Sequence, residues 1–143
     1  MQKIHKIIIP GELPGLNEIL KTAKATNYFK TPTGKRIPDP KAYTYDKMKK
    51  EYTELMRLYS LRAHKCKGMV DMRIWFFSKD KRRDKDNISG GGCKMLFDGL
   101  VAAGIVPNDT WEYIGDYEIK HRVDKQRPRI EVEYWEVEDE CIK

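Results

Sequence analysis

The sequence predicts a single α+β domain in which one mixed sheet is covered by two main helices. The chain has 143 residues, a length that fits one compact domain, which we expect to span residues 1–143. Segments of alternating apolar residues, typical of strands, are interleaved with two segments whose apolar residues recur every three or four positions, typical of helices. Their order along the chain is β-α-β-α-β-β, with no internal repeat and no linker.

The first half of the chain contains one expected strand and one expected helix. Residues 3–9 read as a strand that Pro10 ends, and residues 11–25 as a loop with at most a short helical turn. Residues 26–43 contain three prolines and one glycine and read as a second, long loop. Asp39 and Pro40 form a favourable helix start, and the apolar spacing that follows predicts one helix over 41–63.

The second half contains three expected strands and the second helix. Residues 70–77 alternate between apolar and more polar positions, which predicts a strand with one strongly apolar face. A charged run and a glycine tract follow, and a helix is expected from about Gly92 to Ala103, with Gly104 as its C-cap. Residues 111–123 read as a strand with a break at Gly115, and residues 130–137 as the last strand.

The charge of the chain is unevenly distributed. The net charge is +6, but residues 131–143 hold six acids and one base, so residues 1–130 carry 27 bases against 16 acids. A basic body of this kind is typical of proteins with a polyanionic partner, nucleic acid above all. The alternative is a solvated, lysine-rich surface without such a partner.

The cysteines and the apolar runs indicate the cellular context. There are three cysteines, an odd number without a CxxC pair, which argues against a disulfide scaffold or a structural zinc site and favours a reducing cytoplasm. No apolar run approaches the roughly 18 residues of a membrane-spanning helix, and no signal-peptide pattern is present, so we expect no membrane segment. The histidines His5, His64 and His121 are expected to have no chemical role.

An acidic pair lies where the strand pattern changes to the helix pattern. In an extended segment Asp84 and Asp86 would point to the same side, because side chains two positions apart share a face. Paired carboxylates among cations suggest a Mg²⁺ site facing phosphate, since Mg²⁺ takes one or two carboxylates and completes its shell with water and phosphate oxygens. The alternative is a basic turn whose acids neutralise the neighbouring cations.

Two further positions are candidates for the same site. Lys94 and Asp98 are four apart on one helix face, where they form either a surface ion pair or a phosphate-stabilising lysine with an orienting partner. Asp109 sits at the junction of a loop and a strand, a position that suits a third metal ligand, although Asn108-Asp109 is also an ordinary turn pair.

Taken together, these motifs resemble the RusA-type Holliday-junction endodeoxyribonucleases. The residues that carry the resemblance are DKDN at 84–87, KMLFDGL at 94–100, AG at 103–104, ND at 108–109 and IIIPGELPGLN at 7–17, with Asn17 as its last residue. The resemblance covers most of the chain, and its specific part is residues 82–114. It implies a RusA-like α+β fold.

The resemblance also implies an activity and a set of site residues. The expected protein is a homodimer that uses Mg²⁺, with Mn²⁺ as a substitute, to resolve four-way DNA junctions by paired nicks in recombination and repair. Asp84, Asp86 and Asp109 would hold the metal, and Lys94 would complete the catalytic set. Asn87 would cap the turn or donate a hydrogen bond to one of the aspartates, and Asp98 would orient Lys94.

Two departures from the family pattern affect this assignment. Seven positions separate Asn87 from Lys94, where typical members have about three. Three glycines are a poor helix start, at about 1 kcal/mol each relative to alanine. We therefore expect residues 88–91 to form a non-helical loop, which would leave Lys94 in the first helical turn near the acids. The family also often has two adjacent aspartates where this chain has Asn108-Asp109.

The expected DNA contacts come from cations in two segments. They are Lys79, Lys81, Arg82, Arg83 and Lys85 beside the acidic pair, and Lys30, Lys35 and Arg36 in the long loop. Two other functions stay open: a non-catalytic DNA- or RNA-binding module, and a metal-dependent nucleotide phosphohydrolase. The sequence does not determine the cleavage preference, the number of metal ions or the dimer interface.

Overall fold

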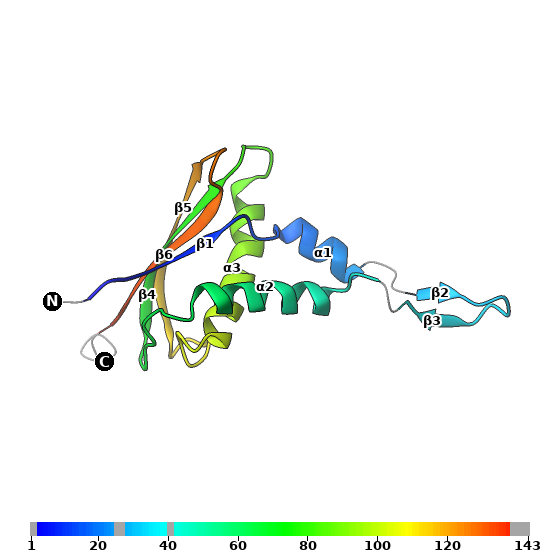
Figure 1. The fold of residues 1–143 in the computed structure, drawn as a ribbon, viewed down its shortest axis with the longest axis horizontal. Coiled ribbons are helices and arrows are strands. Elements are labelled where there is room, and N and C mark those ends of the chain that lie inside the picture. Colours follow the sequence, from blue (N-terminus) through cyan, green and yellow to red (C-terminus); the bar gives the residue numbers. More distant parts are fainter. Residues whose placement is uncertain (1–2, 25–27, 40–41, 138–143) are drawn as a thin grey trace.

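The computed structural model describes residues 3–24, 28–39 and 42–137. It contains a four-stranded sheet with three helices on one face, and a separate two-stranded hairpin (Figure 1). The predicted α+β class is confirmed, whereas the prediction of two helices is wrong. The elements follow the order β1-α1-β2-β3-α2-β4-α3-β5-β6.

The main sheet is mixed, as the sequence predicts. Its strands are β1 (His5–Pro10), β6 (Arg129–Glu136), β4 (Val70–Ser78) and β5 (Ile114–Val123), in that spatial order. β6 is antiparallel to both of its neighbours, and β4 is parallel to β5. A parallel pair needs a crossover connection, and helix α3 supplies it. The predicted break near Gly115 is a register shift, since Val70 pairs with Ile114 but Met72 pairs with Tyr117.

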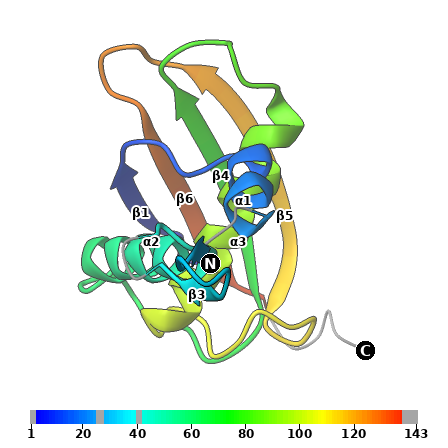
Figure 2. The ribbon, with the colours of Figure 1, turned by 90° about the vertical axis from the view of Figure 1, so that its right-hand side faces the viewer.

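The core lies between the sheet and the helices, which cover the same face (Figure 2). Alternate β4 residues from Val70 to Ser78 are buried, which confirms the predicted apolar face. They meet α3, whose Met95, Leu96 and Leu100 are also buried. This packing fixes the crossover helix across β4 and β5, so the two ends of α3 are held at opposite ends of the sheet.

Two segments predicted as loops form regular structure. Helix α1 (Leu16–Lys24) lies within the first, and the prediction of a turn at best is wrong. Strands β2 (Tyr28–Lys30) and β3 (Arg36–Pro38) form a hairpin within the second, and it projects from the body of the protein (Figure 1). The part of this loop at 26–27 and 40–41 is outside the described residues.

Helix α2 (Tyr45–Tyr59) begins later than predicted. Its N-cap is Thr44, whose hydroxyl accepts a 3.2 Å hydrogen bond from the backbone N–H of Lys47. The predicted start at Asp39 is therefore wrong, and Pro40 lies outside the described residues. Met48 and Met56 of the predicted helix are buried against the rest of the core.

Helix α3 (Lys85–Ala102) is continuous through the glycine tract, so the predicted loop at 88–91 is wrong. The glycines are needed for close packing. A Cβ on Gly91 would lie 2.2 Å from the carbonyl oxygen of Pro14, and one on Gly92 would lie 2.5 Å from the ring of Phe76. Packing against α1 and the sheet thus outweighs the low helix propensity of glycine. No helix in the described part of the chain is long and apolar enough to cross a bilayer.

Candidate functional site

The DKDN segment begins helix α3 and does not extend strand β4. Asp84 is the N-cap, with φ −68° and ψ 152°, and its carbonyl accepts a 3.0 Å hydrogen bond from Ile88. Asp86 lies in the first turn. The prediction that residues 84–87 continue the strand is therefore wrong, and a shared strand face does not bring the two carboxylates together.

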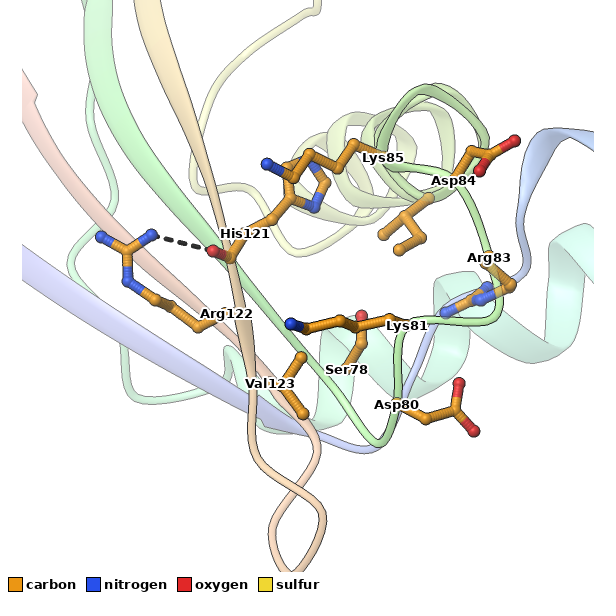
Figure 3. A pocket seen from close by; sticks show the side chains of 10 residues that line it. Ser78, Asp80, Lys81, Arg83, Asp84, Lys85, His121, Arg122 and Val123 are labelled. Carbon is orange, nitrogen blue, oxygen red and sulfur yellow. Dashed lines mark hydrogen bonds between the residues drawn. The ribbon is translucent and has the colours of Figure 1, made fainter.

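A cavity of about 660 Å³ opens beside this helix start. Its walls come from the ends of β4 and β5, the loop between β4 and α3, and the first turn of α3 (Figure 3). The lining residues are Ser78, Asp80, Lys81, Arg83, Asp84, Lys85, Ile88, His121, Arg122 and Val123. The carboxyl ends of neighbouring parallel strands are a general place for ligand binding in sheets with crossover helices.

The cavity favours anions. Lys81 and Lys85 extend toward β5, whereas Asp80 and Asp84 direct their carboxylates away from the cavity (Figure 3). The exposed N–H groups at the start of α3 add partial positive charge on the same side. A phosphate group would therefore find cations inside the cavity and carboxylates at its outer edge.

His121 forms part of the cavity wall and is neutral in character. Its ring stacks on Phe76, with 5.7 Å between the ring centroids. Burial lowers its pKa, and the nearby charge of Lys85 lowers it further. Its Nδ1 atom is buried and has no hydrogen-bond partner among the described residues.

The side chain of Arg83 is largely covered and is held by hydrogen bonds within the protein. Its guanidinium donates a 3.0 Å hydrogen bond to the carbonyl oxygen of Leu13 and a 3.2 Å one to Glu12, and it lies 3.6 Å from Glu18. Its side chain is 22% exposed, whereas that of Arg82 is 88% exposed. Of these two predicted DNA contacts, Arg82 is the accessible one.

The other basic candidates lie in two separate places. Lys79 and Lys81 are exposed in the loop after β4, beside Arg82. Lys30, Lys35 and Arg36 are on the β2–β3 hairpin, well away from the cavity end of the sheet (Figure 1). The two sets therefore form two separate basic surfaces.

Asn87 holds two helices together. Its Oδ1 accepts a 2.7 Å hydrogen bond from the backbone N–H of Asn17, in the first turn of α1. It also packs against Gly15, where a Cβ would lie 2.7 Å from the Asn87 amide nitrogen. Asn87 thus caps α1, and the structure gives it a role different from the predicted support of an aspartate.

Asp109 lies at the other end of α3. It lines a different hollow, together with Phe97, Trp111 and Tyr117. The 18-residue helix is about 27 Å long at 1.5 Å per residue. One chain therefore does not bring Asp109 to Asp84 and Asp86, and the predicted three-aspartate site does not form within it.

Lys94 and Asp98 are also distant from the helix start. Lys94 follows Asp86 by eight residues, or about 12 Å along the axis. Asp98 lies 3.7 Å from Lys49 of α2, so it faces that helix. Because α3 is continuous from Lys85, Lys94 is not in its first turn, whereas Lys85 is.

Sequence reasoning did not place any residue of β5 at the site. His121 and Arg122 line the cavity together with the predicted Lys85 because β4 and β5 are parallel neighbours, a pairing that sequence alone does not give. A second group, His64, Cys66 and Glu136, has ligand atoms within 4.8 Å of one another. The one feature of the sequence that indicates this group is the spacing of His64 and Cys66, which are two positions apart.

No protein-family model matches the chain, and no curated protein is significantly similar to it in sequence.

Proposed function

We propose that this protein binds branched DNA and cleaves its phosphodiester backbone with the help of Mg²⁺. The observation that carries the proposal is the cavity of about 660 Å³ beside the start of α3, where Lys81 of the β4–α3 loop and Lys85 of α3 extend toward β5 and carboxylates lie at the outer edge. The RusA-like motifs agree with this assignment, and the basic hairpin adds a second contact for an extended substrate.

Asp84 and Asp86 are the proposed metal ligands. The side chain of Asp84 makes no capping hydrogen bond to its helix and is exposed, so its oxygens are accessible. A Mg²⁺ ion needs only one or two protein carboxylates when phosphate and water supply the rest. When bound, the ion would polarise a phosphoryl oxygen and activate water for attack.

The cations of the chain would bind and orient the substrate. Lys81 and Lys85 extend along the cavity and would hold phosphates next to the reacting one (Figure 3). Lys85, adjacent to both acids, would stabilise charge that develops on the reacting phosphate. Arg82, exposed on the same loop, would contact the flanking backbone.

A homodimer would explain how Asp109 takes part. Two copies with antiparallel α3 helices would place Asp109 of one chain next to Asp84 and Asp86 of the other, since these residues lie at opposite helix ends. Such a two-fold dimer has two sites, as paired nicking requires. Mixed dimers of Asp86→Asn and Asp109→Asn chains would then regain one intact site, whereas either variant alone would be inactive. Absence of activity in the mixture would exclude a shared site.

The principal test compares three substrates, a labelled four-way junction, a linear duplex and a free nucleotide, each with and without Mg²⁺. We expect cleavage of the junction only with Mg²⁺, and its loss in Asp86→Asn with binding retained. Equal loss of binding and cleavage in Asp86→Asn would indicate a structural role. Hydrolysis of the nucleotide alone would favour a nucleotide phosphohydrolase.

A non-catalytic nucleic-acid-binding module is the second candidate. The observation that favours it is the outward direction of the Asp80 and Asp84 carboxylates, which leaves cations as the main groups inside the cavity (Figure 3). Junction binding that is unaffected by Mg²⁺ and never followed by cleavage would support this function over the first.

A further inference from the structure

A second site of possible metal chemistry lies at the end of the sheet opposite the cavity. Val70, the first residue of β4, pairs with Glu136 of β6, whereas the cavity lies beyond Ser78 at the other end of β4. His64 and Cys66 precede β4 in the loop that follows α2. The imidazole, thiol and carboxylate of this group offer atoms within 4.8 Å of one another.

We infer that His64, Cys66 and Glu136 form a binding site for one Zn²⁺ ion, with water as the fourth ligand. Ligand atoms around a tetrahedral zinc ion, at 2.0–2.3 Å from it, are about 3.5 Å apart. Small rotations of exposed side chains close the difference from 4.8 Å. Nitrogen, sulfur and carboxylate oxygen together suit Zn²⁺ and Co²⁺, whereas Mg²⁺ prefers oxygen alone.

The backbone on both sides of the site is held in place. The Cys66 N–H donates a 2.8 Å hydrogen bond to Ile105, and the Tyr134 hydroxyl donates a 2.7 Å bond to the carbonyl of His64. Glu136 accepts a 3.0 Å bond from the Lys67 N–H through Oε1. Neighbours of this kind orient metal ligands.

His5 lies next to the site but is not one of its donors. Its ring stacks on that of His64, with ring centroids 4.1 Å apart and planes inclined by 10°. A metal ion binds in the plane of an imidazole ring, so two stacked parallel rings do not bind the same ion. Strand β1 pairs with β6 and places His5 opposite Tyr134, where its ring supports that of His64. The three donors come from β6 and the loop before β4.

The burial of the site fits a metal-binding role. Cys66 is 4% exposed, whereas His64 and Glu136 are exposed, so an ion would enter from solvent and rest on a buried sulfur. Binding would release the thiol proton of Cys66 and leave its thiolate coordinated to the metal.

Titration of the full-length, metal-free protein with Zn²⁺ and with Co²⁺ tests the inference. We expect one ion per chain, a higher midpoint of thermal unfolding with Zn²⁺, and a thiolate-to-cobalt charge-transfer band with Co²⁺. The band should vanish in Cys66→Ser and persist in two matched controls, Cys93→Ser and Cys141→Ser. Cys93 is half-buried on α3, and Cys141 is outside the described residues.

Glu136→Gln tests the site with little disturbance of the fold, because the amide keeps an oxygen for the Lys67 N–H. We expect Glu136→Gln to weaken Zn²⁺ binding by about tenfold or more, on the scale seen when metal-site partners are removed. His5→Ala removes a neighbouring ring but no donor, and it should have a smaller effect. Unchanged affinity in Glu136→Gln would overturn the three-donor site. Failure of the wild type to bind Zn²⁺, or a band that depends on Cys93 or Cys141, would overturn the inference entirely.

Discussion

The Oδ1 atom of Asn87 accepts a 2.7 Å hydrogen bond from the backbone N–H of Asn17, so the start of α3 caps the start of α1. Seventy residues of sequence separate the two partners. The bond satisfies one of the N–H groups that a helix leaves unpaired in its first turn. It also places α1 against the segment that carries Asp84 and Asp86, so this contact supports the candidate site indirectly.

Asn87→Ala should lower the free energy of unfolding by about 1 kcal/mol, the usual effect of losing a helix cap. Asn87→Asp keeps the accepting oxygen and should retain most of that stability. Urea unfolding of both variants measures the difference. Equal stability of the two variants would show that the cap contributes nothing.

Gly91→Ala should destabilise the protein by about 2 kcal/mol, because its Cβ would lie 2.2 Å from the Pro14 carbonyl oxygen. Gly90→Ala is the matched control, since its Cβ would meet only the Leu16 side chain at 3.4 Å. It should raise stability by up to about 1 kcal/mol through helix propensity. Thermal unfolding measures whether Gly91→Ala lowers the stability and Gly90→Ala raises it. Equal effects of the two substitutions would contradict the close approach of Gly91 to Pro14.

Arg82→Ala should change DNA binding, whereas Arg83→Ala should change the stability of the fold. Arg82→Ala should leave stability unchanged and reduce the slope of log K against log salt for DNA by roughly 0.9, the value for one lost phosphate contact. Arg83→Ala should cost about 2 kcal/mol of stability, because it removes bonds to Leu13 and Glu12. An unchanged salt slope in Arg82→Ala would place the DNA elsewhere, with the β2–β3 hairpin the first alternative.

Lys85→Ala should slow junction cleavage by about a hundredfold, the scale of losing one group that stabilises the reacting charge. Lys94→Ala should have a much smaller effect, because Lys94 lies about 12 Å along α3 from Asp86. Single-turnover cleavage rates separate the two. A larger loss in Lys94→Ala would restore the assignment that the RusA-like motif suggests.

Glu131 should contribute to stability in a pH-dependent manner. A hydrogen bond from Lys6, and a second from Arg129, lower the pKa of its carboxyl group in the folded protein. The contribution is therefore complete above the unfolded-state value of about 4.3 and is lost as the pH falls through the folded-state pKa. The wild type should exceed Glu131→Gln in urea midpoint near pH 7, and the gap should shrink below about pH 4. Glu112→Gln, in an exposed loop, is the control, and a gap independent of pH would contradict this account.

The sequence predicted elements whose pattern reflects their own burial. Strand β4 alternates because only one of its faces meets the helices, and it was predicted within one residue. Helix α1 was missed because its apolar stripe is short, with Ile19 its one buried residue. The start of α3 was missed because Gly91 and Gly92 look unsuitable for a helix until Pro14 and Phe76 are seen beside them.

The candidate site was predicted in part. The acidic and basic residues around Asp84 do lie at a cavity, because the chain there leaves the end of β4 and enters α3. The prediction that Asp109 joins Asp84 and Asp86 within one chain was wrong, because the position of Asp109 depends on the length and direction of α3. Residues contributed by β5, such as Arg122, depend on parallel pairing and have no local signal.

The position of β6 has a consequence for how the protein is made. Residues 129–136 are the last of the described strands to leave the ribosome, yet they lie between β1 and β4. Until they emerge, β1 has no neighbour in the sheet and β4 has an open edge, the kind of surface on which chains aggregate. Pairing β1 with β6 then joins residues more than a hundred positions apart, such as His5 and Tyr134. Folding of the sheet should therefore be slow and complete only after β6 has emerged, and nascent chains should depend on chaperones to keep these edges apart.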